Sequence, residues 1–231
     1  MVRAFITLVF VGILGLAFAR LALDFAPDAA LNTTAQYYAE NTVAETGAQN
    51  IVAAVIVTYR GLDTLGEVTV LFLTAAIIAL VLAQSSGHVR GSGLLPAGEL
   101  LETGAKMLVP LILLFGIYIF VNGHLTPGGG FQGGAVLASA MLLLLLANPV
   151  RRFSHGILSW IESGSGFFYV VIGVLGLVLG SGFLDNRILP LGSYGAILSA
   201  GAIPLIYTLI GLKVGAEFSS ILESLEETED R

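Results

Sequence analysis

The segment "KMLVPLILLFGIYIFVNGHLTPGGGFQGGAVLASAMLLLLLANP" (Lys106–Pro149) contains two long apolar runs separated by a glycine-rich loop. Lys106 and His124 are its only basic residues, and it has no acidic residue. A helix that crosses a bilayer needs about 20 predominantly apolar residues. The segment therefore indicates two membrane-spanning helices joined by the loop.

The rest of the chain has the same character. Of its 231 residues, 56% are hydrophobic and 11% are charged, whereas soluble domains carry about 25% charged residues. We predict an all-α integral membrane protein with about six transmembrane helices. The expected spans are Ala4–Leu23, Thr64–Gln84, Ala105–Asn122, Gly134–Pro149, Gly166–Leu184 and Gly192–Val214. The fourth is short and must begin inside the glycine loop to cross.

The basic residues predict the orientation, because cytoplasmic loops carry an excess of Lys and Arg. With six crossings, one side holds Arg3, Arg90, Lys106, Arg151, Arg152, Lys213 and Arg231, and the other holds Arg20, Arg60 and Arg187. We expect both termini in the cytoplasm and the glycine loop outside. The first span resembles a signal peptide that ends in "AFA" (Ala17–Ala19), but we expect it to be retained as a helix.

The connections divide the chain into a two-helix module (1–84), a Gly/Ser linker (85–104), a four-helix antiparallel domain (105–217) and an acidic tail (218–231). Residues 24–49 are polar and predict a surface loop. "NIVAAVIVTYR" (50–60) is too short to span and rich in β-branched residues, which predicts a strand-like or half-inserted segment. Pro110 and Pro204 should kink the helices that contain them.

The loop "GHLTPGGGFQGG" (Gly123–Gly134) invites comparison with glycine-rich phosphate loops. A phosphate loop needs Lys followed by Ser or Thr, and a dinucleotide fingerprint needs a preceding strand; neither is present. The alternative is geometric. Pro127 stiffens the turn, Gly128–Gly130 allow positive φ, and Gly133 and Gly134 let the next helix begin against a neighbouring backbone. Irregular backbone at membrane depth must be buried by protein or line a cavity, so we expect the loop to be packed.

The second span opens with two carboxylates on one helical face, since Asp63 and Glu67 are four residues apart. Asp63 suits the membrane interface, and Arg60 can pair with either acid. Glu67 lies about one turn deeper, where an ion is costly unless it is paired or hydrated. Glu67 is either a carboxylate that handles protons or cations, or an ion-pair partner for a basic residue of an adjacent chain.

Ionisable groups also occur at three other places near the ends of predicted helices. Lys106 lies four residues after Glu102 and is expected to extend toward the lipid headgroups. Lys213 and Glu217 are predicted to form a similar interfacial pair. His124 is either a proton-exchanging group or a hydrogen-bonding plug for loop carbonyls.

The sequence predicts no cofactor and no metal site. It contains no cysteine, which excludes disulfides and cysteine-ligated metals, and His88, His124 and His155 lack the spacing of metal ligands. The net charge of −6 comes largely from the acidic tail, so nucleic acid is not an expected partner.

Two motifs carry a family resemblance. "GHLTPGGGFQGG" with the apolar helix after it resembles the B subunit of Mrp-type multisubunit Na⁺/H⁺ antiporters, the MnhB-like family. "NIVAAVIVTYRGLDTLGEVTVLF" (50–72) resembles the C-terminal end of the large A subunit of these antiporters, and a small separate subunit of archaeal membrane-bound hydrogenases and their sulfur-reducing relatives. The matching positions are Arg60, Asp63, Thr64, Gly66 and Glu67 in the second motif, and Gly123, His124, Pro127, Gly128, Gly129, Gly130, Phe131, Gly133 and Gly134 in the first.

The resemblance implies a subunit of a hetero-oligomeric complex in a prokaryotic inner membrane. Its implied partners are membrane lipid, small membrane subunits, and larger subunits related to the antiporter-like subunits of respiratory complex I. The chain is then a transporter subunit without enzymatic activity of its own, which contributes scaffold and part of an ion path. Candidate ion-path residues are Glu67, Asp63, His124 and Lys106.

Three hypotheses remain open at this point. The first is a membrane subunit of an Mrp-type Na⁺/H⁺ antiporter. The second is the equivalent subunit of a hydrogenase or sulfur-reducing complex that couples redox chemistry to ion translocation. The third is a structural adaptor without ion contact.

Overall fold

The computed structural model describes residues 2–25, 30–85, 98–148 and 154–229. The chain divides into two compact units, residues 1–37 and 38–231. Most of the predicted 85–104 linker, including His88 and Arg90, lies outside the described residues, as do Arg151 and Arg152.

The first unit is dominated by α1 (Val2–Asp24), a helix of 23 residues. Its stretch Phe5–Asp24 is long and apolar enough to cross a membrane. Apolar side chains occupy every face of α1, which is typical of a helix whose surroundings are lipid or other membrane subunits. The next helix, α2 (Thr33–Thr46), begins in the first unit and ends in the second.

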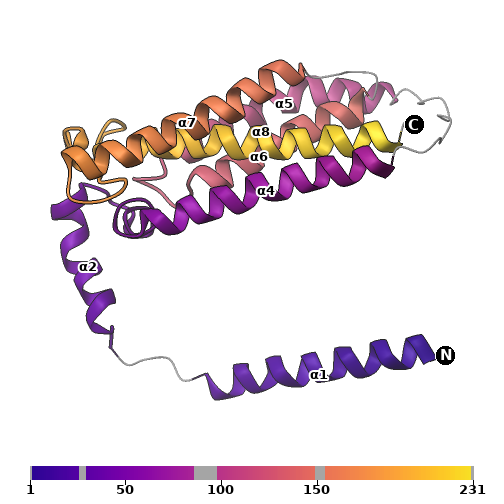
Figure 1. The fold of residues 1–231 in the computed structure, drawn as a ribbon, viewed down its shortest axis with the longest axis horizontal. Helices are drawn as coiled ribbons and strands as arrows, with labels where there is room; N and C mark the ends of the chain where they lie inside the picture. Colours follow the sequence, from indigo (N-terminus) through magenta and orange to yellow (C-terminus); the bar gives the residue numbers. More distant parts are fainter. Residues whose placement is uncertain (1, 26–29, 86–97, 149–153, 230–231) are drawn as a thin grey trace. The chain divides into compact units, whose positions relative to one another are not determined.

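The second unit is a bundle of long helices with short elements at one end (Figure 1). Its elements are α3 (Ile51–Ala54), the π-helical η1 (Val55–Tyr59), α4 (Gly61–Ser85), α5 (Glu99–Val121), α6 (Gly130–Ala147), α7 (His155–Leu179), the 3₁₀ turn η2 (Asn186–Ile188) and α8 (Ile203–Glu229). The glycine loop joins α5 to α6 at the same end as α3 and η1.

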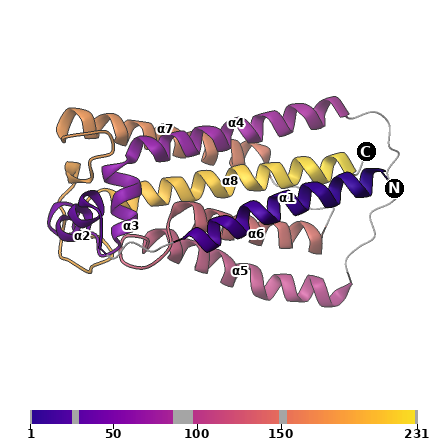
Figure 2. The same cartoon turned by 90° about the horizontal axis from the view of Figure 1, so that it is seen from below.

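The last helix, α8, occupies the centre of this bundle. It contacts α4, α5, α6 and α7, and Figures 1 and 2 show it between them. Of the six candidate spans it is the most buried, at 56%, and the least apolar, with a mean hydropathy of 1.4. Because protein rather than lipid surrounds α8, polar side chains on it can be buried against other helices.

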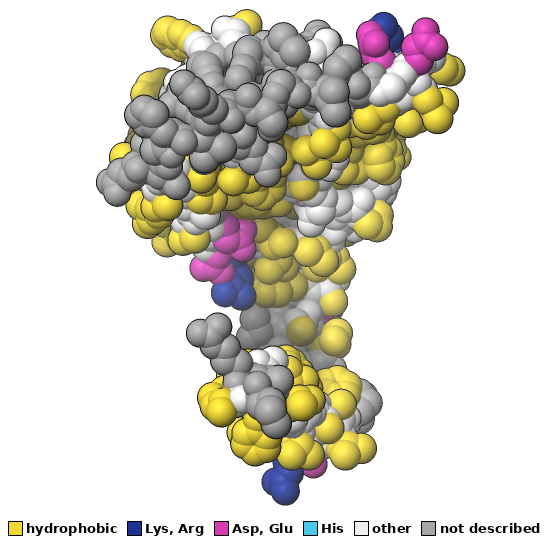
Figure 3. All heavy atoms as spheres, turned by 90° about the vertical axis from the view of Figure 1, so that its right-hand side faces the viewer, with side chains coloured by type: hydrophobic (Ala, Val, Ile, Leu, Met, Phe, Trp, Pro, Cys, Tyr) yellow, Lys and Arg dark blue, Asp and Glu magenta, His cyan; other side chains and the backbone are white. Residues whose placement is uncertain are grey.

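The predicted fold class is confirmed. All regular elements in the described ranges are helices, and six of them are long and apolar enough to cross a membrane. Hydrophobic side chains cover much of the described surface visible in Figure 3, and acidic and basic groups gather in a few small clusters. The glycine loop also behaves as expected, since α6 begins inside it, at Gly130.

Two predicted spans were misplaced. The fifth, predicted at Gly166–Leu184, corresponds to α7, which begins at His155. The polar residues of "SHGILSWIESGS" (154–165) lower the mean hydropathy of its first half. The buried residues Leu158, Ser165 and Tyr169 nevertheless share one helical face.

The sixth predicted span began too early and ended too soon. Residues 192–202 form a loop in which Gly192, Gly195 and Gly201 have positive φ. The helix starts at Ile203 and continues to Glu229, through most of the predicted acidic tail. Within the predicted tail Ser219 and Glu223 are buried, so this part of the chain packs as helix.

The region predicted as a surface loop contains α2. Its residues Thr42 and Thr46 are buried, and their hydroxyls donate to the carbonyls one turn earlier. The strand-like interpretation of "NIVAAVIVTYR" was also wrong, because these residues form α3 and η1. Asn50 caps α3 by accepting the Ala53 N–H, and burial of Val57 in the core overrides the strand preference of the β-branched residues.

The two prolines have different positions in their helices. Pro110 lies inside α5, as predicted. Pro204 is the second residue of α8, in the first turn, where no intrahelical hydrogen bond is lost. The predicted kink at Pro204 was therefore wrong.

Candidate functional site

The glycine loop lets α6 begin in direct contact with α8. A Cβ atom added at Gly130 would lie 2.5 Å from Cβ and Cγ2 of Ile210. One added at Gly134 would lie 2.7 Å from Cβ of Val214. Gly130 and Gly134 are one helical turn apart, the small-residue spacing that permits close helix approach in membranes. The expectation that this loop is packed is confirmed.

Other glycines of the motif serve the same close approach. A Cβ at Gly133 would lie 2.7 Å from the carbonyl oxygen of Gly116 in α5. A Cβ at Gly123 would lie 2.7 Å from Cδ2 of Tyr207 in α8. The loop therefore seats α6 against both α5 and α8.

The turn itself needs glycine at one position for its backbone angle. Gly128 has φ +135°, a region that L side chains rarely adopt. Gly129 is extended, with φ 166°, so the expected positive φ does not extend to it. Pro127 is exposed at the turn, and Phe131 packs against the core.

Gln49 and Asn50 of the N-terminal module form hydrogen bonds to this loop, and we call these two residues the clasp. The backbone N–H groups of Gln49 and Asn50 both donate to the carbonyl of His124, at 3.0 Å each. The Asn50 side chain donates to the carbonyls of Gly123 and Thr126, at 2.9 and 3.0 Å. The two predicted modules are therefore joined by hydrogen bonds between residues more than 70 positions apart.

His124 lies entirely inside this clasp. Its side chain is buried, and Nε2 is 3.2 Å from the carbonyl oxygen of Ala196. Burial lowers the pKa of the His124 imidazole below its usual value, and the Ala196 carbonyl offsets this in part. The neutral ring is thus favoured at neutral pH. This geometry fits the hydrogen-bonding plug of the two interpretations considered for His124.

The start of α4 carries the second motif. Arg60 Nη2 lies 2.5 Å from Asp63 Oδ2, and both side chains are more than half exposed. The Thr64 hydroxyl donates to the carbonyl of Ile56 at 2.8 Å, and Thr64 is fully buried. Thr64 thus ties α4 to the π-helical turn, while the Arg60–Asp63 pair faces outward.

Glu67 and Gly66 lie on an open surface of α4. Glu67 is exposed, one helical turn after Asp63. A Cβ at Gly66 would have no atom of the described chain within 4 Å. Glycine at this position is therefore not required by packing among the described residues.

Lys106 belongs to the opposite end of the bundle. Its Nζ lies 2.8 Å from Glu102 Oε1, and the Lys106 side chain is 72% exposed. The structure therefore does not bring Lys106 together with Glu67 or His124, which lie toward the glycine-loop end.

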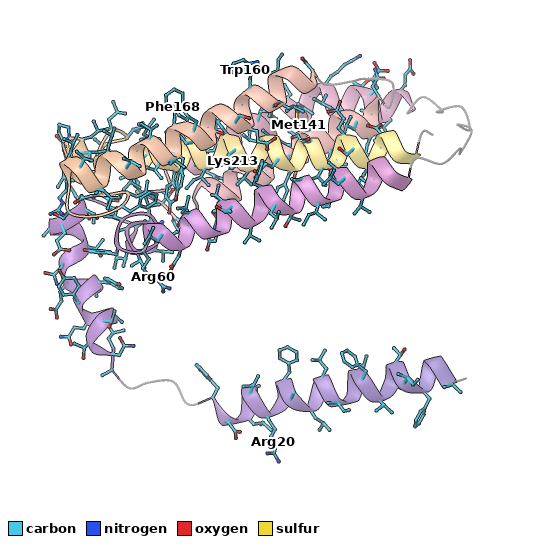
Figure 4. All side chains as sticks on the ribbon, viewed as in Figure 1. Arg20, Arg60, Met141, Trp160, Phe168 and Lys213 are labelled. Carbon is cyan, nitrogen blue, oxygen red and sulfur yellow. The ribbon has the colours of Figure 1, made fainter. Side chains whose placement is uncertain are left out.

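Sequence reasoning misjudged the Lys213–Glu217 pair. Lys213 Nζ lies 2.6 Å from Glu217 Oε1, with side-chain exposures of 9% and 0%, so this pair is buried rather than interfacial. Lys213 also lies over the Phe72 ring, 5.1 Å from its centroid. Figure 4 shows Lys213 near the middle of α8. The i, i+4 spacing was visible in the sequence, but the centrality of α8 was not.

A second buried network was missed in the loop that follows α7. Asp185 is 3% exposed, and it accepts hydrogen bonds from the backbone N–H groups of Ser181 and Arg187 and from the Arg187 guanidinium. The Arg187 side chain lowers the pKa of Asp185 to about 2. Asn186 donates to the carbonyls of Thr46 and Ala200. This loop is thereby held against the end of α2.

Within the described ranges, no three His, Cys, Asp or Glu residues are grouped as metal ligands. The ionisable groups form a different pattern, namely exposed pairs at the helix ends and a buried pair in the central helix. The fold and these groups define a multi-pass helical membrane protein with charge in its interior.

The family follows from comparison with known proteins. Residues 100–220, just over half of the chain, match the family described as a domain related to the MnhB subunit of Na⁺/H⁺ antiporter. Residues 2–86 match the family described as the E subunit of MBH. The chain belongs to the MnhB-related family, and the resemblance expected from the two motifs is confirmed.

Relatives cover the chain to different extents. An uncharacterized protein of Methanocaldococcus jannaschii is 29% identical, over 79% of this chain and 82% of that protein. The B subunit of the Na⁺/H⁺ antiporter of Bacillus subtilis is 38% identical, over 38% of this chain and 63% of that relative. The chain thus spans less than two thirds of the Bacillus protein.

Two solved structures share the fold over almost the whole chain. A chain of the membrane-bound sulfane sulfur reductase, an archaeal respiratory membrane complex, is 38% identical with a TM-score of 0.82, over 97% of this chain and 98% of that one. A chain of the Mrp complex from Dietzia sp. DQ12-45-1b is 26% identical with a TM-score of 0.78, over 96% of this chain and 26% of that one. Both structures are multisubunit membrane complexes.

Proposed function

We propose that this chain is a membrane subunit of an Mrp-type complex that exchanges a monovalent cation such as Na⁺ for protons, and that it contributes both scaffold and ion path. The observation that carries the proposal is the fold match over 96% of the chain to part of an Mrp complex. The match includes both modules, which here are joined by the Asn50 clasp.

The surface supports a role inside a larger assembly. The window of α4 that is apolar enough to span a membrane is only 6% buried within the chain. The same surface carries the Arg60–Asp63 pair and Glu67. A carboxylate facing plain lipid is costly, so we propose that a partner subunit or an ion covers Glu67.

The four candidate ion-path residues differ in their position in the bundle and in their exposure. Glu67 and Asp63 lie near the glycine-loop end, and Lys106 lies near the other end in an exposed pair. His124 is enclosed by the clasp. We retain Glu67 as the first residue to test, and we treat His124 as a group that shapes the loop.

The orientation is part of the proposal. Both termini are placed in the cytoplasm of a prokaryotic cell, with the glycine-loop end on the outer side, because Lys and Arg are more numerous on the side of the termini. Labelling of single cysteines introduced at Ser85 and Ser193 with a membrane-impermeant reagent tests it. Modification of whole cells at Ser193 and not at Ser85 is expected, and the reverse pattern would contradict the orientation.

Deletion of this chain tests the function. Inverted membrane vesicles are energised to build a pH gradient, and Na⁺ is added while the gradient is followed with a fluorescent amine. Vesicles with the whole complex should lose part of the gradient on Na⁺ addition, and vesicles without this chain should not. Exchange that survives deletion would refute the proposal.

A second candidate is favoured by one observation, the 98% coverage of a chain in the sulfane sulfur reductase complex. In this alternative the chain is the corresponding subunit of a complex that couples redox chemistry to ion translocation. Gentle purification of the whole complex and identification of its subunits by mass spectrometry distinguishes the two. An iron–sulfur protein in the purified complex would select the redox-coupled complex.

A further inference from the structure

The charged pair in α8 lies deep in the bundle. Lys213 and Glu217 are ten and fourteen residues from the start of α8 at Ile203. At a rise of about 1.5 Å per residue, they lie about 15 and 21 Å along a helix of about 40 Å. Both therefore fall near the middle of the hydrocarbon core, which is about 30 Å thick.

The contribution of an ion pair to folding stability does not explain why one lies at this depth in the bundle. Buried ion pairs seldom stabilise more than apolar side chains of the same volume, and ionisable residues inside membrane bundles usually mark ion or proton pathways. Only one oxygen of Glu217 is satisfied by Lys213. Glu217 Oε2 is buried and has no hydrogen-bond partner among the described residues.

A second carboxylate faces this pair from α7. Glu162 interacts electrostatically with Glu217. One helical turn further along α7, a Cβ at Gly166 would lie 3.6 Å from Lys213 Nζ. Gly166 therefore lies beside the Lys213 side chain, at ordinary van der Waals distance. One ammonium and one carboxylate are in contact here, and a second carboxylate lies on the adjacent helix, so the charges do not cancel when both acids are ionised.

In the part of the chain that the structure describes, the other helices around the pair add no further charge at its level. From α4 the Phe72 ring covers Lys213. The sequence of α6, Gly130–Ala147, has no titratable residue. On α5, Glu102 and Lys106 form their own exposed pair, and the Glu67 carboxylate of α4 lies about one and a half turns before Phe72.

We propose that Glu217, with Lys213 and Glu162, is a proton-transfer site in the membrane interior. Oε2 of Glu217 takes up a proton, which forms the O–H bond of a neutral carboxyl group and leaves the net charge of the three groups at zero. The same proton later leaves from Oε2, and no other bond forms or breaks. Glu67 lies on α4 between the glycine-loop end and Phe72, which covers this site.

The inference rests on the proposed function, since an exchanger needs a proton carrier inside the bilayer, but it has its own readout. The full chain in lipid nanodiscs is titrated, and the carbonyl stretch of protonated carboxyl groups is followed by infrared difference spectroscopy. Besides the bands of the exposed acids, the wild type should show a separate band from a buried carboxyl group that disappears as the pH rises. Glu217→Gln should abolish it, and Glu162→Gln should move its midpoint to lower pH, because a neighbouring negative charge favours protonation.

The matched control is Glu102→Gln, which removes the acid of the exposed pair with the same i, i+4 spacing and should leave the band unchanged. Because Glu217→Gln leaves Lys213 unpaired and can prevent folding, the double variant Lys213→Met with Glu217→Gln is measured as well and should also lack the band. A band that persists in both variants, or no titrating band in the wild type, would overturn the proposal.

A second measurement uses the whole complex in proteoliposomes. If the assembled Glu217→Gln complex exchanges cation for protons with the wild-type rate and pH profile, the inference is wrong. The expected result is a rate lower by roughly a factor of ten or more, because an amide cannot carry the proton. If the wild-type complex shows no exchange but the Glu217 band titrates, the proposed function fails and the proton site stands.

Discussion

Replacing Gly130 with alanine should destabilise the bundle by about 1–3 kcal/mol, the usual cost of overpacking a close contact. The added Cβ would lie 2.5 Å from Cβ and Cγ2 of Ile210 and 2.9 Å from the carbonyl oxygen of Tyr207. Ordinary contacts begin at about 3.4 Å, so α6 and α8 would have to separate locally by about 0.9 Å. A gap of 0.5–1 Å loses roughly a quarter to a half of the contact energy across it.

The gain from helix propensity is too small to compensate. Alanine is favoured over glycine by up to about 1 kcal/mol inside a helix, and Gly130 is only the first residue of α6. The matched control is Gly164→Ala in α7, where an added Cβ would meet no atom of the described residues within 4 Å. The control should be neutral or slightly stabilising.

Unfolding of the purified chain by increasing SDS in detergent micelles, followed by circular dichroism, measures both variants. Gly130→Ala should lower the midpoint, and Gly164→Ala should leave it unchanged or raise it. Equal midpoints for the two variants would refute the close approach of α6 and α8.

Asn50→Ala should lower the free energy of unfolding by about 2–4 kcal/mol, because it removes a helix cap and two hydrogen bonds to loop carbonyls. Amide hydrogen exchange should accelerate in the glycine loop, and unchanged exchange would contradict the role of Asn50 in holding it. The pKa of His124 is lower in the folded chain than in the unfolded one. The stability of the chain should therefore decrease as the pH falls below about 6.5, the pKa of the unfolded histidine. His124→Gln should remove this pH dependence, and a pH dependence that persists in the variant would show that another group causes it. Asp185→Asn should destabilise the chain by about 1–2 kcal/mol above pH 4. Because the folded pKa of Asp185 is about 2, the difference from wild type should vanish as the pH falls toward 2, and a constant difference would show that charge is not its cause. Gly66→Ala should leave the stability of the isolated chain unchanged but reduce the yield of the assembled complex, and a normal yield would show that no partner helix approaches there.

Average hydropathy predicted the helices whose sequences are apolar almost throughout. The apolar runs at α1, α4, α5 and α6 are visible in the sequence because few polar residues interrupt them, and their mean hydropathies are 2.3, 2.4, 2.2 and 1.9. The same average failed at the first half of α7, where Glu162 and Ser165 lower it. It failed again in the second half of α8, where Glu217 and Glu223 are buried against protein.

The motifs predicted the close packing of the glycine loop but not its partners. The glycines at positions 130, 133 and 134 predict that another helix packs closely against α6, but they do not identify that helix. That depends on the placement of α8 in the centre, which is a property of the whole bundle. The Lys213–Glu217 pair was expected at the membrane interface for the same reason. Its i, i+4 spacing predicts that the two side chains pair, but only the tertiary structure shows how deep in the bundle they lie.

The central position of α8 has a consequence for biosynthesis. The ribosome makes α4, α5, α6 and α7 before α8, and Ile210 follows Gly130 by 80 residues. At a translation rate of 5–20 residues per second, the Ile210 side chain that covers Gly130 is synthesised about 4–16 s after Gly130 itself. During that interval the glycine surface of α6 is open to lipid, to the insertion machinery or to a neighbouring protein, so the nascent bundle needs a temporary occupant until its core helix arrives.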